Sequence, residues 1–238
     1  MQHVLVTGAS RGIGLEFARH YLDRGAQVFA GYRRPETAGK LFDLTESHPE
    51  RLVLVPLDVS DEASIRASRN RVGESSKSLD LLINNAGIGG FSSLTGKQEQ
   101  LGSFQFDDSW VVLRTMAVGP LLIAQEYLDL LKAGENAQIA NVTSGYGSIS
   151  SNTSRFPYYY SAAKSALHQL MRSLAADVRP MGISVVLLDP GSVQTDMGGP
   201  TAPLTPHESV AGMISVIESL TLAQSGSFIS WQGRTMPW

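Results

Sequence analysis

The segment HVLVTGASRGIG, residues 3–14, joins a short apolar run to a glycine-rich turn and to the first residues of a helical pattern. Its glycines, Gly8, Gly12 and Gly14, have the spacing G-x-x-x-G-x-G. Glycines in such a turn let the backbone approach a pyrophosphate closely, and the free N–H groups at the helix start attract its negative charge. A glycine triplet alone can be only a tight strand-to-helix turn, but a strand before it and a helix after it favour a dinucleotide site. No Walker lysine follows, which disfavours a nucleotide triphosphatase.

Six further apolar runs of strand length follow along the chain. They are QVFAGY (27–32), LVLVPLD (52–58), LDLLIN (79–84), AQIANVTS (137–144), ISVVLLDP (183–190) and SFISW (227–231). Few of them alternate polar with apolar residues, which is typical of strands buried on both faces of a parallel sheet. Amphipathic helical patterns separate them, for example IGLEFARHYLDRG, where Gly25 is expected to end the helix. We therefore predict a single α/β domain over residues 1–238, with a Rossmann-type, doubly wound sheet of seven parallel strands alternating with six helices that cover both faces.

Two connections are expected to serve as substrate loops, over about residues 88–108 and 196–206. The stretch from Gly87 to Asp107 is longer than connections without secondary structure usually are in compact domains, and such loops are often functional. Aromatic side chains such as Phe91, Phe104 and Trp110 are expected to shape the pocket there.

Two helix starts can be predicted from their capping residues. Thr205 is expected to cap the last long helix, with Pro206 at its first position and Glu208 completing a capping box. Asp107 and Asp108 are expected to cap the helix that follows the first long loop.

The composition excludes several classes of protein. The chain of 238 residues has no cysteine and a formal net charge of -3. Without cysteine there is no disulfide, thiol nucleophile or thiolate metal site, and a cytoplasmic location fits best. The scattered basic residues argue against nucleic acid, and no run approaches the ~20 apolar residues of a membrane-spanning helix. No histidine is placed in the sequence to partner the serines near Ser144, so a hydrolase is not expected.

The histidines are far apart in the sequence and lack carboxylates at metal-ligand spacings, so no metal site is expected. They are His3, His20, His48, His168 and His207.

The end of the second predicted strand carries the residues that should select the cofactor. In NAD-binding folds an acid ~20 residues after the glycines holds the ribose 2′-hydroxyl. Here Tyr32 has that position, Arg33 and Arg34 follow it, and Arg11 projects from the glycine turn. These arginines could be solvated residues of a turn, but guanidinium groups pair bidentately with phosphate. The sequence therefore favours NADP(H) over NAD(H).

Tyr160 and Lys164 lie four residues apart in PYYYSAAKSALHQL (157–170), so a helix would place them on one face. A neighbouring ammonium group favours the phenolate and lowers the phenol pKa from ~10 toward neutrality, where the phenol can exchange protons. An isolated Y-x-x-x-K is more often a surface pair, so this interpretation needs support from other motifs. Tyr158 and Tyr159 are assigned to packing or to the pocket wall.

Several motifs follow one another in order along nearly the whole chain. They are TGASRGIG (7–14), LDVSD (57–61), NNAG (84–87), NVTSGYGS (141–148), YSAAK (160–164) and PGSVQTDM (190–197). With them the chain resembles the short-chain dehydrogenase/reductase family, and its C-terminal half is similar to the C-factor-like and sniffer-like carbonyl reductases. The resemblance implies an NADPH-dependent oxidoreductase that reduces a carbonyl compound (aldehyde, ketone or quinone-like) to an alcohol. It also implies a homodimer or homotetramer.

The same resemblance implies roles for individual residues. Ser144 would hydrogen-bond the substrate oxygen, Tyr160 would be the general acid and base, and Lys164 would bind the nicotinamide ribose while lowering the pKa of Tyr160. Hydride transfer leaves an alkoxide developing on the carbonyl oxygen, which requires a proton donor and a second hydrogen bond there. Ser144 alone could be an ordinary turn residue, but its place between a strand end and the Tyr-Lys helix favours catalysis. The implied cofactor-binding residues are Gly8, Ser10, Arg11, Gly12, Ile13, Gly14, Arg33, Asp58, Val59, Asn85, Ala86, Gly87, Tyr160, Lys164, Pro190, Gly191, Val193 and Thr195.

One position departs from the family pattern. The helix after the long loop usually carries Asn in V-N-x-x-G, and this Asn is associated with a water relay to the lysine, whereas LRTMAVGPLL has Met116 there. A slowed enzyme is expected. The alternative is a nucleotide-binding signalling or scaffold protein of the same fold that has lost turnover.

Overall fold

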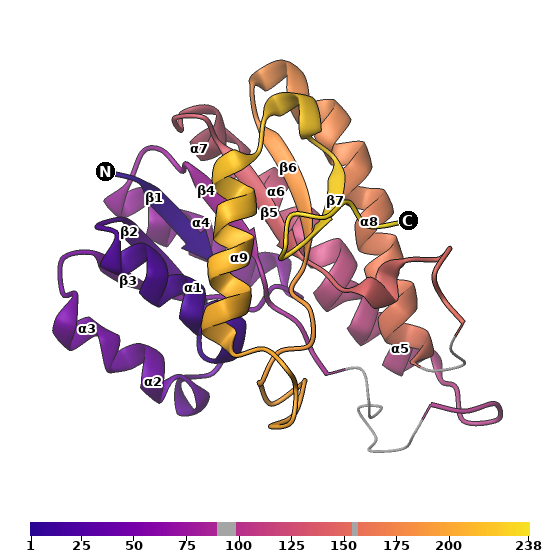
Figure 1. Cartoon of the computed structure of the whole chain (residues 1–238). Helices are drawn as coiled ribbons and strands as arrows, with labels where there is room; N and C mark the ends of the chain where they lie inside the picture. The colour runs from indigo at the N-terminus through magenta and orange to yellow at the C-terminus, as the bar shows by residue number, and fades with distance from the viewer. Residues whose placement is uncertain (90–98, 154–156) are drawn as a thin grey trace.

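The structure is a computed structural model that describes residues 1–89, 99–153 and 157–238. These residues form one parallel sheet of seven strands in the order β3-β2-β1-β4-β5-β6-β7 (Figure 1). The strands are β1 (His3–Val6), β2 (Gln27–Tyr32), β3 (Leu52–Pro56), β4 (Leu81–Asn84), β5 (Gln138–Val142), β6 (Ser184–Asp189) and β7 (Ser227–Ser230). All seven predicted apolar runs are therefore strands. The order reverses between β1 and β4, the point where open α/β sheets bind ligands.

Helices cover both faces of the sheet, as expected. The α-helices are α1 (Gly12–Asp23), α2 (Gly39–Phe42), α3 (Leu44–Ser47), α4 (Glu62–Ser75), α5 (Phe106–Leu113), α6 (Gly119–Glu126), α7 (Leu128–Lys132), α8 (Tyr158–Val178) and α9 (Pro206–Ser219). The described residues thus form nine α-helices and not the six predicted, because α2 and α3 share one connection between strands and α5, α6 and α7 share another. The shorter helical turns are η1 (Pro35–Thr37), η2 (Arg114–Val118), η3 (Gly145–Gly147), η4 (Arg179–Met181) and η5 (Leu222–Gln224), and η2 is a π-helix. In Figure 1, α9 crosses the face of the sheet nearest the viewer.

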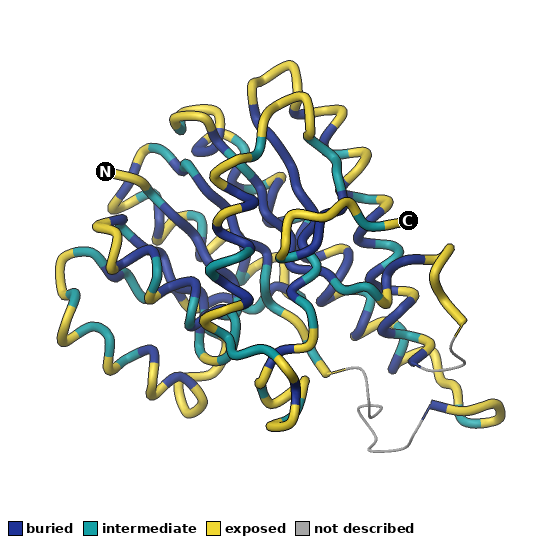
Figure 2. Tube along the Cα trace, in the orientation of Figure 1, coloured by how far each residue is buried: buried dark blue, intermediate teal, exposed yellow. Residues whose placement is uncertain are grey.

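Side chains of each strand alternate between two hydrophobic clusters, one on each face of the sheet. Val4 and Val6 of β1 face the cluster that contains Phe17 of α1 and Met213 of α9. Leu5, between them, faces the cluster formed with α4, α6, α7 and α8, which includes Tyr127. The strands are therefore buried on both sides and form the dark blue centre of the molecule in Figure 2.

Most of the predicted helix ends are confirmed. Thr205 caps α9 through the backbone N–H of Glu208, whose side chain completes the capping box, and Pro206 is the first residue of the helix. Gly25 follows the last turn of α1 with a φ of 83°, a left-handed conformation that favours glycine. The prediction that Asp107 and Asp108 cap the following helix is wrong, because the N-cap of that helix is Gln105.

Helix α5 begins earlier than the two aspartates require. Its N-cap is Gln105, with no side-chain capping bond, and Asp107 and Asp108 lie in the first turn. The physical reason is the hydroxyl of Tyr159, which donates to the carbonyl of Gln105 and accepts its backbone N–H. These bonds hold Gln105 in an extended conformation before the helix, so the helix starts at Phe106.

The first predicted substrate loop is described in part and the second in full. Residues 90–98 of the first, with Phe91, lie outside the described residues. In its described part, Phe104 packs edge-on against the rings of Tyr158 and Tyr159 at the start of α8. In the second, Leu204 forms an isolated β-bridge with Val193, in the segment that follows β6.

Candidate active site

A broad cleft of about 1420 Å³ lies at the carboxyl ends of the strands. Its walls come from the glycine turn after β1 and from the residues that follow β2, β3, β4, β5 and β6. The predicted cofactor residues line this cleft, with the exception of Gly191 and Val193. Val193 is buried in the bridge to Leu204, and Gly191, at a φ of 73°, packs against Leu204 and Trp231.

The glycine turn is fixed to the end of β4. The side-chain amide of Asn85 donates to the carbonyl oxygens of Thr7 and Gly8, over 3.0 and 3.1 Å. Gly8 has a φ of 65°, and a Cβ there would lie 2.8 Å from the Cα of Ala86; a Cβ at Gly14 would collide with the carbonyl oxygen of Gly8. Only glycine fits both positions, so the turn keeps the close backbone approach that a pyrophosphate needs.

Ser144 is hydrogen-bonded to Tyr160, which lines the cleft, although Ser144 itself is not among the lining residues. Ser144 follows β5, where its hydroxyl accepts the backbone N–H of Tyr146 at 3.2 Å. Tyr160 lies in the first turn of α8 and is 7% exposed. Burial raises the pKa of the Tyr160 phenol above its usual value, the hydrogen bond with Ser144 lowers it, and the nearby Asp189 carboxylate raises it.

Lys164 lies one turn further along α8 and lines the same cleft. Its Nζ is 5.8 Å from the centre of the Tyr160 ring and donates to the carbonyl oxygen of Val142 at 3.0 Å. Burial lowers the pKa of Lys164 to about 8. The expectation that the lysine brings the Tyr160 pKa down is wrong for this structure, because desolvation of the phenol has the largest effect on its pKa and raises it.

Basic side chains gather where the cleft runs past the end of β2. Arg33 and Arg34 line it there as predicted, and Lys40 of α2 joins them. Lys40 was not foreseen, because it reaches the cleft only through the placement of η1 and α2, which no motif marks. Arg11 also lines the cleft, and its guanidinium donates to the Asp196 carboxylate at 2.8 Å. Arg11 therefore ties the glycine turn to the second predicted loop.

Two acids that sequence reasoning missed hold the segments that carry the predicted catalytic residues in place. A carboxylate oxygen of Glu99 accepts the backbone N–H groups of Tyr158 and Tyr159, at 2.6 and 3.0 Å, at the start of α8. A carboxylate oxygen of Asp189, at the end of β6, accepts the N–H of Gly145 at 3.0 Å, next to Ser144. Glu99 lies 59 residues before Tyr158, so no local pattern could have indicated that contact.

Met116 lies in η2 and is 1% exposed. It packs with Val112, Tyr160 and Ala163 in a small apolar cluster and also lines the cleft. π-helical turns inside α-helices are frequent at functional sites. The residue that departs from the family pattern is therefore in contact with the apolar side of the predicted catalytic tyrosine.

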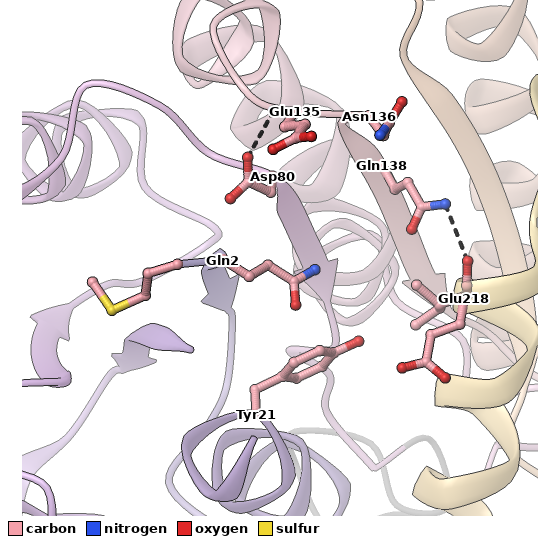
Figure 3. A pocket seen from close by; sticks show the side chains of 9 residues that line it. Gln2, Tyr21, Asp80, Glu135, Asn136, Gln138 and Glu218 are labelled. Carbon is pink, nitrogen blue, oxygen red and sulfur yellow. Dashed lines mark hydrogen bonds between the residues drawn. The ribbon is translucent and has the colours of Figure 1, made fainter. Parts of the chain in front are cut away.

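A second, smaller hollow of about 340 Å³ lies at the opposite end of the strands, where β1, β4 and β5 begin. Figure 3 shows Gln2, Tyr21, Asp80 and Glu218 around it. Asp80 is engaged there with the backbone N–H of Glu135. Since none of the predicted site residues lines this hollow, the cleft at the carboxyl ends is the candidate active site.

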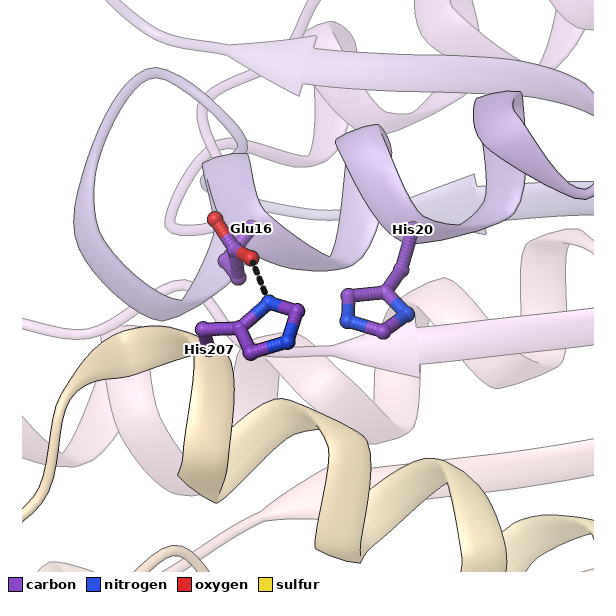
Figure 4. Close-up of side chains that lie close together, drawn as sticks. All are labelled: Glu16, His20 and His207. Atoms are coloured by element: carbon purple, nitrogen blue, oxygen red, sulfur yellow. Dashed lines mark hydrogen bonds and ion pairs between the residues drawn. The ribbon is translucent and has the colours of Figure 1, made fainter.

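His20 and His207 are far apart in the sequence, but the fold brings them together beside the carboxylate of Glu16. The rings of His20 and His207 lie 5.0 Å apart, and Nδ1 of His207 is 3.0 Å from a carboxylate oxygen of Glu16 (Figure 4). The physical reason is that α1 packs against α9, which brings together residues 191 positions apart.

Comparison with known proteins gives consistent matches. The family model described as short chain dehydrogenase matches residues 2–203. C-signal of Myxococcus xanthus is 41% identical over 160 residues, which are 67% of this chain and 93% of that protein. The NADPH-bound carbonyl reductase from chicken fatty liver has 38% identity and a TM-score of 0.90, covering 100% of this chain and 99% of that one. The carbonyl reductase Sniffer of D. melanogaster has 31% identity and a TM-score of 0.91, covering 100% of both. Among the described residues, no helix combines the length and apolarity needed to span a membrane.

Proposed function

This chain belongs to the short-chain dehydrogenase family, and we propose that it uses NADPH to reduce the carbonyl group of an aldehyde, ketone or quinone-like compound to an alcohol. The observation that supports this most is that Tyr160, hydrogen-bonded to Ser144, lines one cleft together with Lys164 and Arg33. The NADPH bound in the chicken carbonyl reductase supports the choice of cofactor.

The chain's own residues fit the groups that this reaction needs. Bound NADPH would supply a hydride to the carbonyl carbon. Tyr160 then donates the proton that the developing alkoxide takes up, and the Ser144 hydroxyl gives the same oxygen a second hydrogen bond. Burial keeps the pKa of Tyr160 high, so the phenol holds its proton at neutral pH and acts as the acid in the reductive direction. Lys164 would bind the nicotinamide ribose.

The experiment that tests this proposal is an assay of NADPH oxidation with a panel of aldehydes, ketones and quinones. Loss of NADPH absorbance that depends on the carbonyl compound supports it. Tight NADPH binding without turnover of any compound would instead support the nucleotide-binding protein without catalysis. That second candidate rests on the apolar Met116 beside Tyr160.

Cofactor selection is expected to depend on the basic residues after β2. Arg33→Ala should weaken NADPH binding about 10- to 100-fold, the value of one charge-assisted hydrogen bond, and leave NADH binding nearly unchanged. A fluorescence titration with both cofactors measures this. Arg179→Ala, an exposed arginine in η4 away from the cleft, is the matched control and should change neither affinity. Equal binding of NADPH and NADH by the unaltered protein would contradict the preference.

Met116 is expected to limit the rate of proton delivery. Met116→Asn should raise kcat by about 2- to 10-fold, a part of the roughly 10²–10⁴ that positioned proton transfer contributes. The same change should lower the free energy of unfolding by about 1–3 kcal/mol, because it buries an amide among apolar side chains. Met116→Leu is the control, since it keeps the apolar contacts and should leave kcat unchanged. If kcat does not rise at all in the Asn variant, this position does not limit the reaction.

We further propose that the chain forms a homo-oligomer through the face that contains α5 and α8. Helix α5 exposes Phe106 and Trp110, which are 84% and 59% accessible. Large exposed apolar side chains on one helix are typical of interaction surfaces. Light scattering would show a dimer or tetramer, and a monomeric mass at all concentrations would rule out the assembly.

A further inference from the structure

A group of metal-ligating side chains lies where α1 packs against the start of α9. Glu16 and His20 are one turn apart on the same face of α1, and His207 is the second residue of α9. One ligand atom from each of the three lies within 4.8 Å of the others. In Figure 4 the His20 ring faces the ring of His207, which in turn points its Nδ1 at the Glu16 carboxylate. The geometry points to a zinc site, and we propose that Glu16, His20 and His207 bind Zn²⁺.

The hydrogen bonds that these side chains already make leave a ring nitrogen that can bind a cation. Nε2 of His20 is shielded from solvent and has no hydrogen-bond partner among the described residues, which is costly for a ring nitrogen. Nδ1 of His207 pairs with Glu16, and the bond to the carboxylate holds the imidazole in place. A metal coordinated by His20 would satisfy the nitrogen that the protein leaves unpaired.

The type and number of ligands select the ion. Two imidazoles and one carboxylate are a ligand set that zinc takes with a fourth position open to water. Zinc–ligand bonds of about 2.0–2.1 Å in a tetrahedron put ligand atoms about 3.3 Å apart, so the most widely separated pair must approach by at most about 1.5 Å. His207 can supply this movement, because its side chain is 71% exposed, whereas the side chain of Glu16, on α1, is only 15% exposed.

The backbone under the site is already in place. Phe17 and Tyr21 of α1 and Val210 and Met213 of α9 belong to one buried cluster, so the two helices are fixed relative to each other without a metal. Arg19 lies 3.8 Å from Glu16 and is the cation that a metal would displace from that carboxylate. Its side chain is 45% exposed, so solvent can take over its charge.

The position of the site gives it a function. His207 directly follows the segment 196–206, whose other end is tied to the glycine turn by the ion pair of Arg11 and Asp196. Zinc at this position would fasten the second end of the segment to α1. The ion would therefore stabilise the rim of the cleft, and Glu16 and Pro206, which line the cleft, would be held with it.

The test uses untagged full-length protein and metal alone, so it does not depend on cofactor or substrate. Titration with Co²⁺ is expected to give saturable visible absorption at one equivalent, which Zn²⁺ then abolishes by displacement. Loss of even an outer-shell partner costs about 10- to 100-fold in metal affinity. His207→Ala, which removes a direct ligand from an exposed position, should therefore weaken binding by at least about 100-fold.

The matched control is His48→Ala, which removes a histidine outside the cluster and should leave metal affinity unchanged. Zn²⁺ should also raise the Tm of the unaltered protein and of His48→Ala but not of His207→Ala, since binding to the folded state stabilises it. Circular dichroism establishes that both variants fold. The proposal is overturned if Co²⁺ binds without saturation, or if His207→Ala binds as tightly as the unaltered protein. Neither outcome would affect the proposed reductase activity, which the NADPH assay tests separately.

Discussion

Tyr160→Phe is expected to lower kcat/KM for NADPH-dependent carbonyl reduction by about 10³-fold, within the range that general acid catalysis contributes. The change removes one hydroxyl group and keeps the ring, which is packed against Val112, Met116 and Ala163. NADPH affinity and folding should therefore be nearly unchanged. Steady-state kinetics with the best substrate of the panel, together with a fluorescence titration of NADPH, measures both.

Tyr158→Phe is the matched control for this variant. It removes the same atom from a neighbouring side chain that is 41% exposed and does not line the cleft. Its kcat/KM should stay close to that of the unaltered protein. If Tyr160→Phe kept more than about a tenth of the activity, the phenol would not be the proton donor, and the proposed mechanism would be wrong.

The parts of the fold that were predicted correctly are those encoded by local patterns. β1 and the glycine turn follow from a short apolar run and the steric needs of Gly8 and Gly14, which depend on a few neighbouring residues. The capping box at Thr205 and Glu208 is likewise contained within four positions. Such features survive folding because no distant contact competes with them.

The errors and omissions concern contacts between distant segments. Asp107 is a residue type that often caps helices, but the Tyr159 hydroxyl on α8 sets the start of α5 instead. Glu99 and His207 each act on residues far away in the sequence, and no spacing rule connects them. The direction of the Tyr160 pKa shift was also wrong, because the phenol's burial is a property of the folded protein that an i, i+4 spacing does not reveal.

Lys164→Met is expected to make the protein more stable at pH 7 while reducing kcat/KM by at least about 10²-fold. The activity is lost because the proposed contact with the nicotinamide ribose and the charge beneath Tyr160 are removed; an effect of this size is usual for a lost transition-state interaction of about 3 kcal/mol. The stability rises because the ammonium group is buried, and burial lowers its pKa from 10.5 to about 8.

The sign of the stability effect follows from proton binding. Below pH 8 the lysine is protonated in both the folded and the unfolded state, so the folded state bears the full desolvation cost, about 3 kcal/mol at 1.36 kcal/mol per pKa unit. Between pH 8 and 10.5 the unfolded chain binds more protons than the folded one, so the stability of the unaltered protein rises with pH. Methionine has no such cost but loses the hydrogen bond from the ammonium group to Val142, which is worth about 1.5–3 kcal/mol because the donor is charged.

Together these terms predict that Lys164→Met is more stable by up to about 1.5 kcal/mol at pH 7, a rise in Tm of up to about 6 °C for a chain of this length. The difference should shrink as the pH rises from 8 toward 10.5, because the lysine of the folded protein is then uncharged and no longer bears the desolvation cost. Thermal unfolding at a series of pH values measures it, with Lys132→Met at an exposed position of α7 as the control for loss of a surface lysine. A Tm for Lys164→Met below that of the unaltered protein at pH 7 would mean that the buried ammonium group is stabilised by contacts stronger than the single bond to Val142. In that case the Lys164 ammonium group would stabilise the folded protein and would not lower its stability.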